Sequence, residues 1–87
     1  MPMMSAHTIR DEVVSALTAI APEVAPASIA DDVALRSQVD LDSMDWLNFL
    51  VGVHRRLHVS IPEKDYASLR TLADVVHYVQ HHAPESS

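Results

Sequence analysis

An all-α fold is predicted by two features of the sequence. Apolar residues recur at three- and four-residue spacing in several segments, which is the period of an amphipathic helix. No segment alternates apolar and polar residues over a useful length, as a half-buried strand would. With 87 residues, the chain is expected to form one domain with a small core. We expect a small four-helix bundle, with three longer helices, one short third helix and a long loop between helices one and two.

The first helix is expected to begin at Thr8, because Thr8 and Asp11 have the spacing of a capping box. An apolar stripe follows at helical spacing: Ile9, Val13, Val14, Leu17 and Ile20. Pro22 ends this pattern. Residues 1–7 are therefore expected to be a flexible N-terminus.

The next segment, residues 22–42, contains two prolines and several small residues but no sustained helical period. We expect a long loop that is held to the core by five apolar side chains: Ile29, Val33, Leu35, Val39 and Leu41. A connection of this length is uncommon in a compact domain and often belongs to a functional region.

The second helix is expected over residues 43–58, with Asp42 as its N-cap and Asp45 reaching back as in a capping box. Its buried stripe is predicted at the following positions: Leu47, Leu50, Val51, His54 and Leu57 or His58. Gly52, the only glycine of the chain, lies inside this helix. An interior glycine costs about 1 kcal/mol relative to alanine, so we expect another helix to approach closely there.

A short third helix is expected from about residue 60 to Leu69. Ser60 and Glu63 have the spacing of a capping box, and Pro62 suits a first helical turn.

The last helix is expected to begin at Thr71, because Thr71 and Asp74 again have capping-box spacing. Four apolar residues then form its buried stripe: Leu72, Val75, Val76 and Val79. The helix is expected to end near His82, before Pro84 and a polar C-terminal tail over residues 83–87.

The composition limits the kinds of partner. Twelve acidic and six basic residues give a formal charge of −6, which disfavours nucleic acid and anionic membranes and favours basic protein surfaces. No stretch is apolar and long enough to span a bilayer, and the first residues lack the features of a secretory signal. The absence of cysteine excludes disulfides and suits a reducing compartment. We expect a cytoplasmic monomer.

Ser43 is the candidate functional residue, because it stands at the mouth of an apolar helix among three carboxylates. Free backbone N–H groups and the positive end of the helix dipole would lie beside its hydroxyl, where a phosphate ester fits. A catalytic serine would need a base within reach, and the sequence offers neither an obvious base nor a Gly-x-Ser-x-Gly elbow. We therefore expect that the protein is not an enzyme. Taken alone, Ser43 after Asp42 also suits an ordinary helix start.

The sequence around Ser43 resembles that of an acyl carrier protein. This family has Gly-x-Asp-Ser-Leu at the start of its second helix, and here Asp42, Ser43 and Met44 align with Asp-Ser-Leu. Asp40 stands where the family usually has glycine. The resemblance covers residues 33–79 and extends more loosely to the first helix.

The resemblance implies an acyl carrier domain over residues 8–82. It implies that a phosphopantetheinyl transferase attaches 4′-phosphopantetheine from coenzyme A to Ser43, and that the thiol of this arm holds acyl groups as thioesters. The carrier would present them to acyl-loading and acyl-using enzymes of fatty acid, polyketide or related biosynthesis. Two alternatives stay open. One is a peptidyl or aminoacyl carrier, although that group often has histidine in place of Asp42. The other is a helical protein–protein interaction module with unmodified Ser43.

Partner enzymes with basic docking patches are expected to contact the start of the second helix at four residues: Asp42, Met44, Asp45 and Trp46. Residues 46–62 contain no carboxylate but include Arg55 and Arg56, so the acidic surface is confined to one end of the helix. Trp46 is either a partly exposed anchor for a partner or a ring that folds over the edge of the core.

Two histidine pairs, His54 with His58 and His77 with His81, have a four-residue spacing that can place two imidazoles on one metal ion. No acidic or cysteine ligand completes either pair at a standard spacing, so we expect no metal site.

Overall fold

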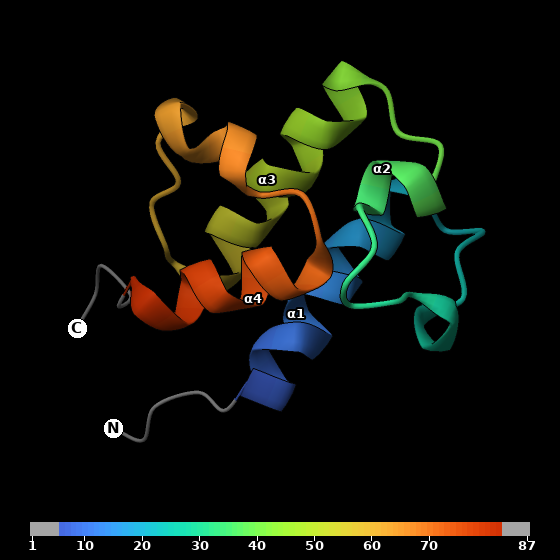
Figure 1. Cartoon of the computed structure of the whole chain (residues 1–87), viewed down its shortest axis with the longest axis horizontal. Coiled ribbons are helices and arrows are strands. Elements are labelled where there is room, and N and C mark those ends of the chain that lie inside the picture. Colours follow the sequence, from blue (N-terminus) through green and yellow to red (C-terminus); the bar gives the residue numbers. More distant parts are fainter. Residues whose placement is uncertain (1–5, 83–87) are drawn as a thin grey trace.

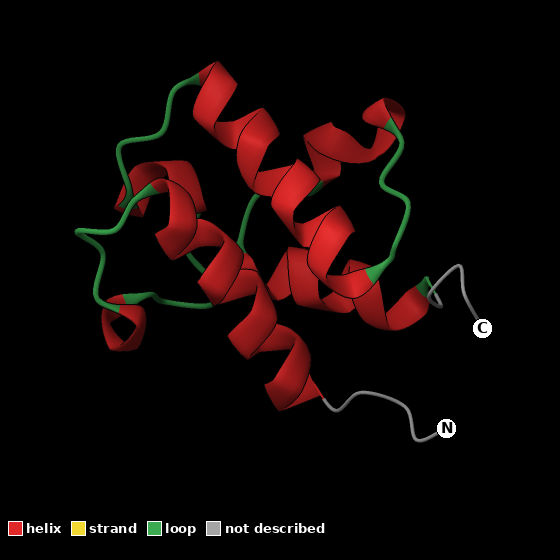
Figure 2. Ribbon diagram, turned by 180° about the vertical axis from the view of Figure 1, so that it is seen from behind, coloured by secondary structure: helices red, strands yellow, loops and turns green. Residues whose placement is uncertain are grey.

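The computed structural model describes residues 6–82, and within this range it is helical with no strand, as the sequence predicts. The helical elements of the described residues follow one another in this order: α1 (Ala6–Ile20), η1 (Pro26–Ser28), α2 (Leu35–Gln38), α3 (Ser43–Leu57), η2 (Glu63–Ser68) and α4 (Leu72–His81). Figure 1 labels the four α-helices. Three of them are long, and the segment between α1 and α3 forms one side of the molecule (Figures 1 and 2). The expected C-terminal tail, residues 83–87, lies outside the described residues, as do residues 1–5 of the expected flexible N-terminus.

The core lies where α1 packs against both α3 and α4. Its largest fully buried side chains come from all three long helices and from the connections between them: Phe49, Leu17, Leu35, Leu50, Leu72, Val13, Val53, Val59 and Val75. A Cβ atom on Gly52 would lie 3.4 Å from the Cβ of Ala16. The close helix–helix approach predicted at Gly52 is therefore confirmed, and it occurs between α1 and α3.

The buried face of α3 differs from the predicted one. Leu47 and Val51 are each 42% exposed, and His54 is exposed as well. Leu50 and Leu57 are buried as predicted. The rest of the face that packs on the core consists of Trp46, Phe49 and Val53. These positions also recur at three- and four-residue spacing, and they bury the two largest aromatic side chains of the helix. Burial of Trp46 and Phe49 removes more apolar surface from water than burial of Leu47 and Val51 would, so the face with the aromatic residues packs on the core.

The connection over residues 21–42 is only partly a loop, because it contains the short helices η1 and α2. Four of the five predicted anchors are buried, namely Ile29, Leu35, Val39 and Leu41, whereas Val33 is 43% exposed. The side-chain amide of Gln38 holds this segment together. Its nitrogen donates to the carbonyl oxygens of Ala30 and Val33 at 2.9 and 2.8 Å, and its oxygen accepts from the Ala30 N–H at 2.8 Å.

Backbone contacts tie the same connection to α4. The Leu35 N–H donates to the Arg70 carbonyl at 2.8 Å, and the Ala73 N–H donates to the Asp31 carbonyl at 3.0 Å. The Asp31 carboxylate also pairs with Arg10 of α1 at 2.9 Å. The segment before α3 is thus fixed at several points, which gives the start of α3 a defined position.

The helix boundaries confirm some predicted caps and correct others. The capping box of α4 is complete, with the Asp74 N–H donating to the Thr71 hydroxyl at 3.0 Å and the Thr71 N–H donating to the Asp74 carboxylate at 3.1 Å. Helix α1 begins at Ala6, so Thr8 lies inside the helix and does not cap it. Residues 6 and 7, which we expected to belong to the N-terminal segment, are part of α1.

The predicted third helix is a 3-10 helix, η2, whose N-cap is Pro62. The N-cap of η2 is therefore Pro62 and not Ser60, the residue expected from the capping-box spacing with Glu63. In α4, Leu72, Val75 and Val79 are buried as predicted, but Val76 is only partly buried.

Candidate functional site

Ser43 is the first residue of α3, and its side chain is exposed. The preceding residue caps the helix as predicted, because the Asp42 carboxylate accepts a hydrogen bond from the Asp45 N–H at 2.8 Å. The Asp42 carbonyl accepts from the Trp46 N–H at 2.9 Å, which is the first intrahelical bond of α3. The N–H groups of Ser43 and Met44 thus belong to the part of a helix start that has no carbonyl partner within the helix.

The residues before Ser43 alternate between the core and the solvent. Val39 and Leu41 are buried, while Asp40 and Asp42 are exposed. The Leu41 carbonyl also accepts a hydrogen bond from Nε of Arg36 at 3.3 Å. Two buried anchors and this contact hold the chain in place, so the hydroxyl of Ser43 is presented to solvent from a fixed backbone.

The surroundings of Ser43 suit a phosphate ester better than nucleophilic catalysis. On α3 itself the first imidazole is that of His54, eleven residues away, which corresponds to a rise of about 16 Å along the helix axis. A base at that distance does not reach the hydroxyl. An ester phosphate on Ser43, by contrast, would lie at the positive end of the α3 dipole, beside backbone N–H groups. The Asp42 carboxylate is already engaged by the Asp45 N–H.

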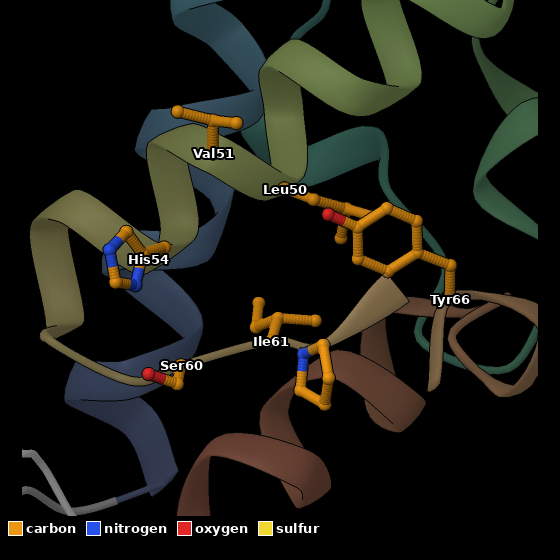
Figure 3. Close-up of a pocket in the computed structure, with 7 residues that line it drawn as sticks. Leu50, Val51, His54, Ser60, Ile61 and Tyr66 are labelled. Carbon is orange, nitrogen blue, oxygen red and sulfur yellow. The ribbon is translucent and has the colours of Figure 1, made fainter. Parts of the chain in front are cut away.

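An apolar hollow of about 410 Å³ lies farther along α3, where the helix faces the segment that leads into η2. Figure 3 shows the side chains of Leu50, Ile61 and Tyr66 turned toward the same space. Val51 and His54 complete its α3 side. We call this hollow the apolar pocket. Sequence reasoning missed it, because it depends on how α3 and η2 are placed relative to each other.

The residues expected to contact partners are not equally exposed. Met44 is 66% exposed, Asp42 is exposed, and Asp45 is partly buried. Trp46 is only 8% exposed, and its ring lies 5.2 Å from that of Phe49 between ring centroids. The partly exposed placement considered for Trp46 is therefore wrong, and the interpretation that it covers the edge of the core is correct.

Three exposed apolar residues lie along one face of α3, beginning next to Ser43: Met44, Leu47 and Val51. We call them the α3 stripe. Their spacing of three and four residues places them above one another on the helix surface. Sequence reasoning missed the α3 stripe because it assigned Leu47 and Val51 to the core.

Within residues 6–82, no group of three or more histidine, cysteine, aspartate or glutamate side chains is arranged to hold a metal ion. The predicted pair His77 and His81 does meet, with ring centroids 4.2 Å apart. None of the helices described is both long and apolar enough to cross a membrane.

A small helical bundle that holds an exposed serine at a capped helix start has the architecture of a carrier domain, and comparison with known proteins agrees. The family described as phosphopantetheine attachment site matches residues 8–79. The chain is 32% identical over 78 residues to an acyl carrier protein of Rhodococcus erythropolis, covering 86% of this chain and 85% of that one. It is 31% identical over 74 residues to the meromycolate extension acyl carrier protein of Mycolicibacterium smegmatis, covering 82% of this chain and 75% of that protein. It is 28% identical over 68 residues to the mitochondrial acyl carrier protein of Saccharomyces cerevisiae, covering 78% of this chain and 54% of that protein.

The chain therefore belongs to the phosphopantetheine-attachment family, and its role is that of an acyl carrier. The cofactor of this family is 4′-phosphopantetheine. Acyl carrier proteins are carriers, and they act together with biosynthetic enzymes.

Proposed function

We propose that Ser43 is the residue that carries the 4′-phosphopantetheine arm. The observation that supports this most strongly is the exposed Ser43 hydroxyl at a start of α3 that Asp42 caps. The arm, when attached, supplies a thiol that holds an acyl group as a thioester. The protein's own contribution is to fix the serine on a rigid helix end and to offer backbone N–H groups to the ester phosphate.

We propose that the modifying enzyme is a phosphopantetheinyl transferase that uses coenzyme A and that modification takes place in the cytoplasm. Partner enzymes, including those that load and use the acyl group, would approach the same end of α3. Met44 is exposed there, and the carboxylates of Asp42 and Asp45 supply negative charge for basic docking patches. The α3 stripe extends this surface away from Ser43. It is an apolar surface with a charged rim, which is a common arrangement in protein interfaces.

The apolar pocket is proposed to receive the acyl chain. It is lined by Leu50, Ile61 and Tyr66 and begins about two helical turns from Ser43, so an arm anchored on Ser43 passes along α3 to reach it. Burial of a longer chain removes more apolar surface from water, by about 0.8 kcal/mol for each methylene that is fully buried. The octanoyl-loaded form should therefore melt at a higher temperature than the acetyl-loaded form. Equal melting temperatures would contradict this proposal.

Intact-mass analysis tests the attachment site. The chain is incubated with coenzyme A and a transferase of broad specificity, and one phosphopantetheinyl mass is expected to be added. Ser43→Ala should abolish the addition, whereas Ser37→Ala is the matched control, because Ser37 is an exposed serine on the neighbouring helix α2. Complete modification of Ser43→Ala would refute the assignment. A parent chain that stays unmodified would favour the interaction-module alternative.

A further inference from the structure

A second hollow, of about 430 Å³, lies between α2, the first turns of α3 and the end of η2. Tyr66 lines both this hollow and the apolar pocket. The two differ in character, because two arginines border the second hollow: Arg36 of α2 and Arg70, which follows η2. Trp46 of α3 forms another part of its wall. We call this hollow the arginine pocket.

Neither of these two arginines forms an ion pair with another described residue, although the Asp74 carboxylate lies near Arg70 and accepts a hydrogen bond from its backbone N–H at 3.1 Å. Arg10 and Arg56 pair with carboxylates at 2.9 and 3.3 Å, but within residues 6–82 no carboxylate lies within 4.0 Å of the guanidinium nitrogens of Arg36 or Arg70. Nε of Arg36 donates to the Leu41 carbonyl at 3.3 Å, and its two terminal nitrogens form no ion pair within residues 6–82. None of the residues that line the pocket is acidic. The arginine pocket is therefore bordered by two positive charges without an ion-pair partner in the described part of the chain, whose net charge over its full length is −6.

We propose that the arginine pocket binds the free carboxylate of a dicarboxylic acyl group, of the malonyl or succinyl type, carried on the arm of Ser43. This inference rests on the proposed attachment at Ser43. Guanidinium groups match carboxylates in charge and in planar geometry. Trp46 lies three residues after Ser43, so the wall of the pocket is only about 4.5 Å farther along the helix axis than the attachment point.

Because the acyl group is attached to the arm, a site of low affinity is enough to bind its carboxylate. A group tethered by a short flexible linker has an effective concentration on the order of millimolar at a site that the linker can reach. Arg36 and Arg70, which are exposed and screened by salt, are therefore able to hold a tethered carboxylate that they would not retain from free solution. The phosphate of the arm is a poorer candidate for the pocket, because it is fixed on Ser43 beside the backbone N–H groups of α3.

Trp46 allows a direct test, since it is the only tryptophan of the chain and it lines the pocket. The indole N–H resonance is recorded by NMR for the unmodified protein and for the forms that carry the bare arm, the acetyl-loaded arm and the malonyl-loaded arm. Intact mass confirms that each form is completely loaded. We expect the malonyl form to differ from the acetyl form in the Trp46 resonance, and we expect this difference to shrink at high salt.

Three variants decide whether the pocket is responsible. Arg36→Gln and Arg70→Gln should each remove most of the difference between malonyl and acetyl forms. Arg55→Gln is the matched control, an exposed arginine on α3 outside the pocket, and it should preserve the difference. Circular dichroism checks each fold, and Arg70→Gln decides alone if Arg36→Gln unfolds through loss of its contact with Leu41.

Three results would overturn the proposal. One is an identical Trp46 resonance in completely loaded malonyl and acetyl forms. Another is an equal loss of the difference in Arg55→Gln, which would indicate a general effect of charge. The third is an arginine-dependent shift that is already complete with the bare arm, because the pocket would then hold the phosphate. Absence of any added mass on Ser43 would instead refute the proposed function itself, so the two failures are distinguishable.

Discussion

Val75 and Val76 are neighbours on α4 whose different burial predicts different costs of truncation. Val75 is 0% exposed, whereas Val76 is only partly buried. Valine to alanine removes two carbons, which at about 0.8 kcal/mol for each buried methylene is a loss of about 1.6 kcal/mol. At Val75 the cavity left behind adds to this loss, and the higher helix propensity of alanine offsets about 0.5 kcal/mol of it.

Val75→Ala should therefore lower the free energy of unfolding by about 2 kcal/mol, a large share of the roughly 5–10 kcal/mol expected for a domain of this size. That corresponds to a decrease of about 8–16 °C in the melting temperature. Val76→Ala should cost less than about 1 kcal/mol, because part of its side chain stays in water in the folded state.

Urea unfolding followed by far-UV circular dichroism and by the fluorescence of the buried Trp46 measures both values. Coincidence of the two transitions supports the two-state analysis on which the free energies depend. An equal cost for the two substitutions, or a larger cost for Val76→Ala, would refute the orientation of α4 in the bundle.

The remaining predictions concern Tyr78, Asp74 and the acidic end of α3. The Tyr78 hydroxyl donates to the Asp65 carboxylate at 2.7 Å, so Tyr78→Phe should cost about 1–2 kcal/mol in urea unfolding, and no loss would show that this bond contributes nothing. Burial and this bond raise the pKa of Tyr78 to about 12, which an absorbance titration of the parent against Tyr78→Phe measures. The stability that the bond contributes should therefore be complete below pH 10.0 and lost as the pH rises through about 12. Burial opposes ionisation of Asp74, but hydrogen bonds from the backbone lower its pKa overall; its contribution is therefore lost as the pH falls through that lowered value, and Asp74→Asn should show a weaker loss of stability in acid. Asp45→Lys should slow transfer of the arm more than Arg55→Glu does, with a difference that shrinks as salt is added, and equal effects would remove any role for the acidic end of α3.

Several features that depend on local sequence were predictable, although the capping-box spacing at Thr8 and at Ser60 did not mark the start of a helix. The cap at Asp42, the capping box at Thr71 and the close approach at Gly52 each follow from one or a few residues whose preferences are strong. The all-α class followed from the period of the apolar residues. Ser43 was identified as the candidate site because the same local pattern places it at a helix start.

The features that depend on packing were not predictable. Helix α3 is apolar on two faces, so its period alone did not decide whether Leu47 and Val51 or Phe49 and Val53 face the core. That choice depends on the shape of the surface offered by α1. The clamp made by Gln38 was missed for a related reason, because an amide that replaces regular backbone hydrogen bonds leaves no periodic signal.

Localisation of the arm by fragment-ion mass spectrometry tests the central proposal most directly. Trypsin releases residues 37–55 as one peptide that contains both Ser37 and Ser43, so peptide mass alone does not separate the two serines. Fragment ions of the modified parent peptide are predicted to place the phosphopantetheinyl mass on Ser43, with Ser37 unmodified. Fragments that place it on Ser37, or on a peptide outside this range, would contradict the account.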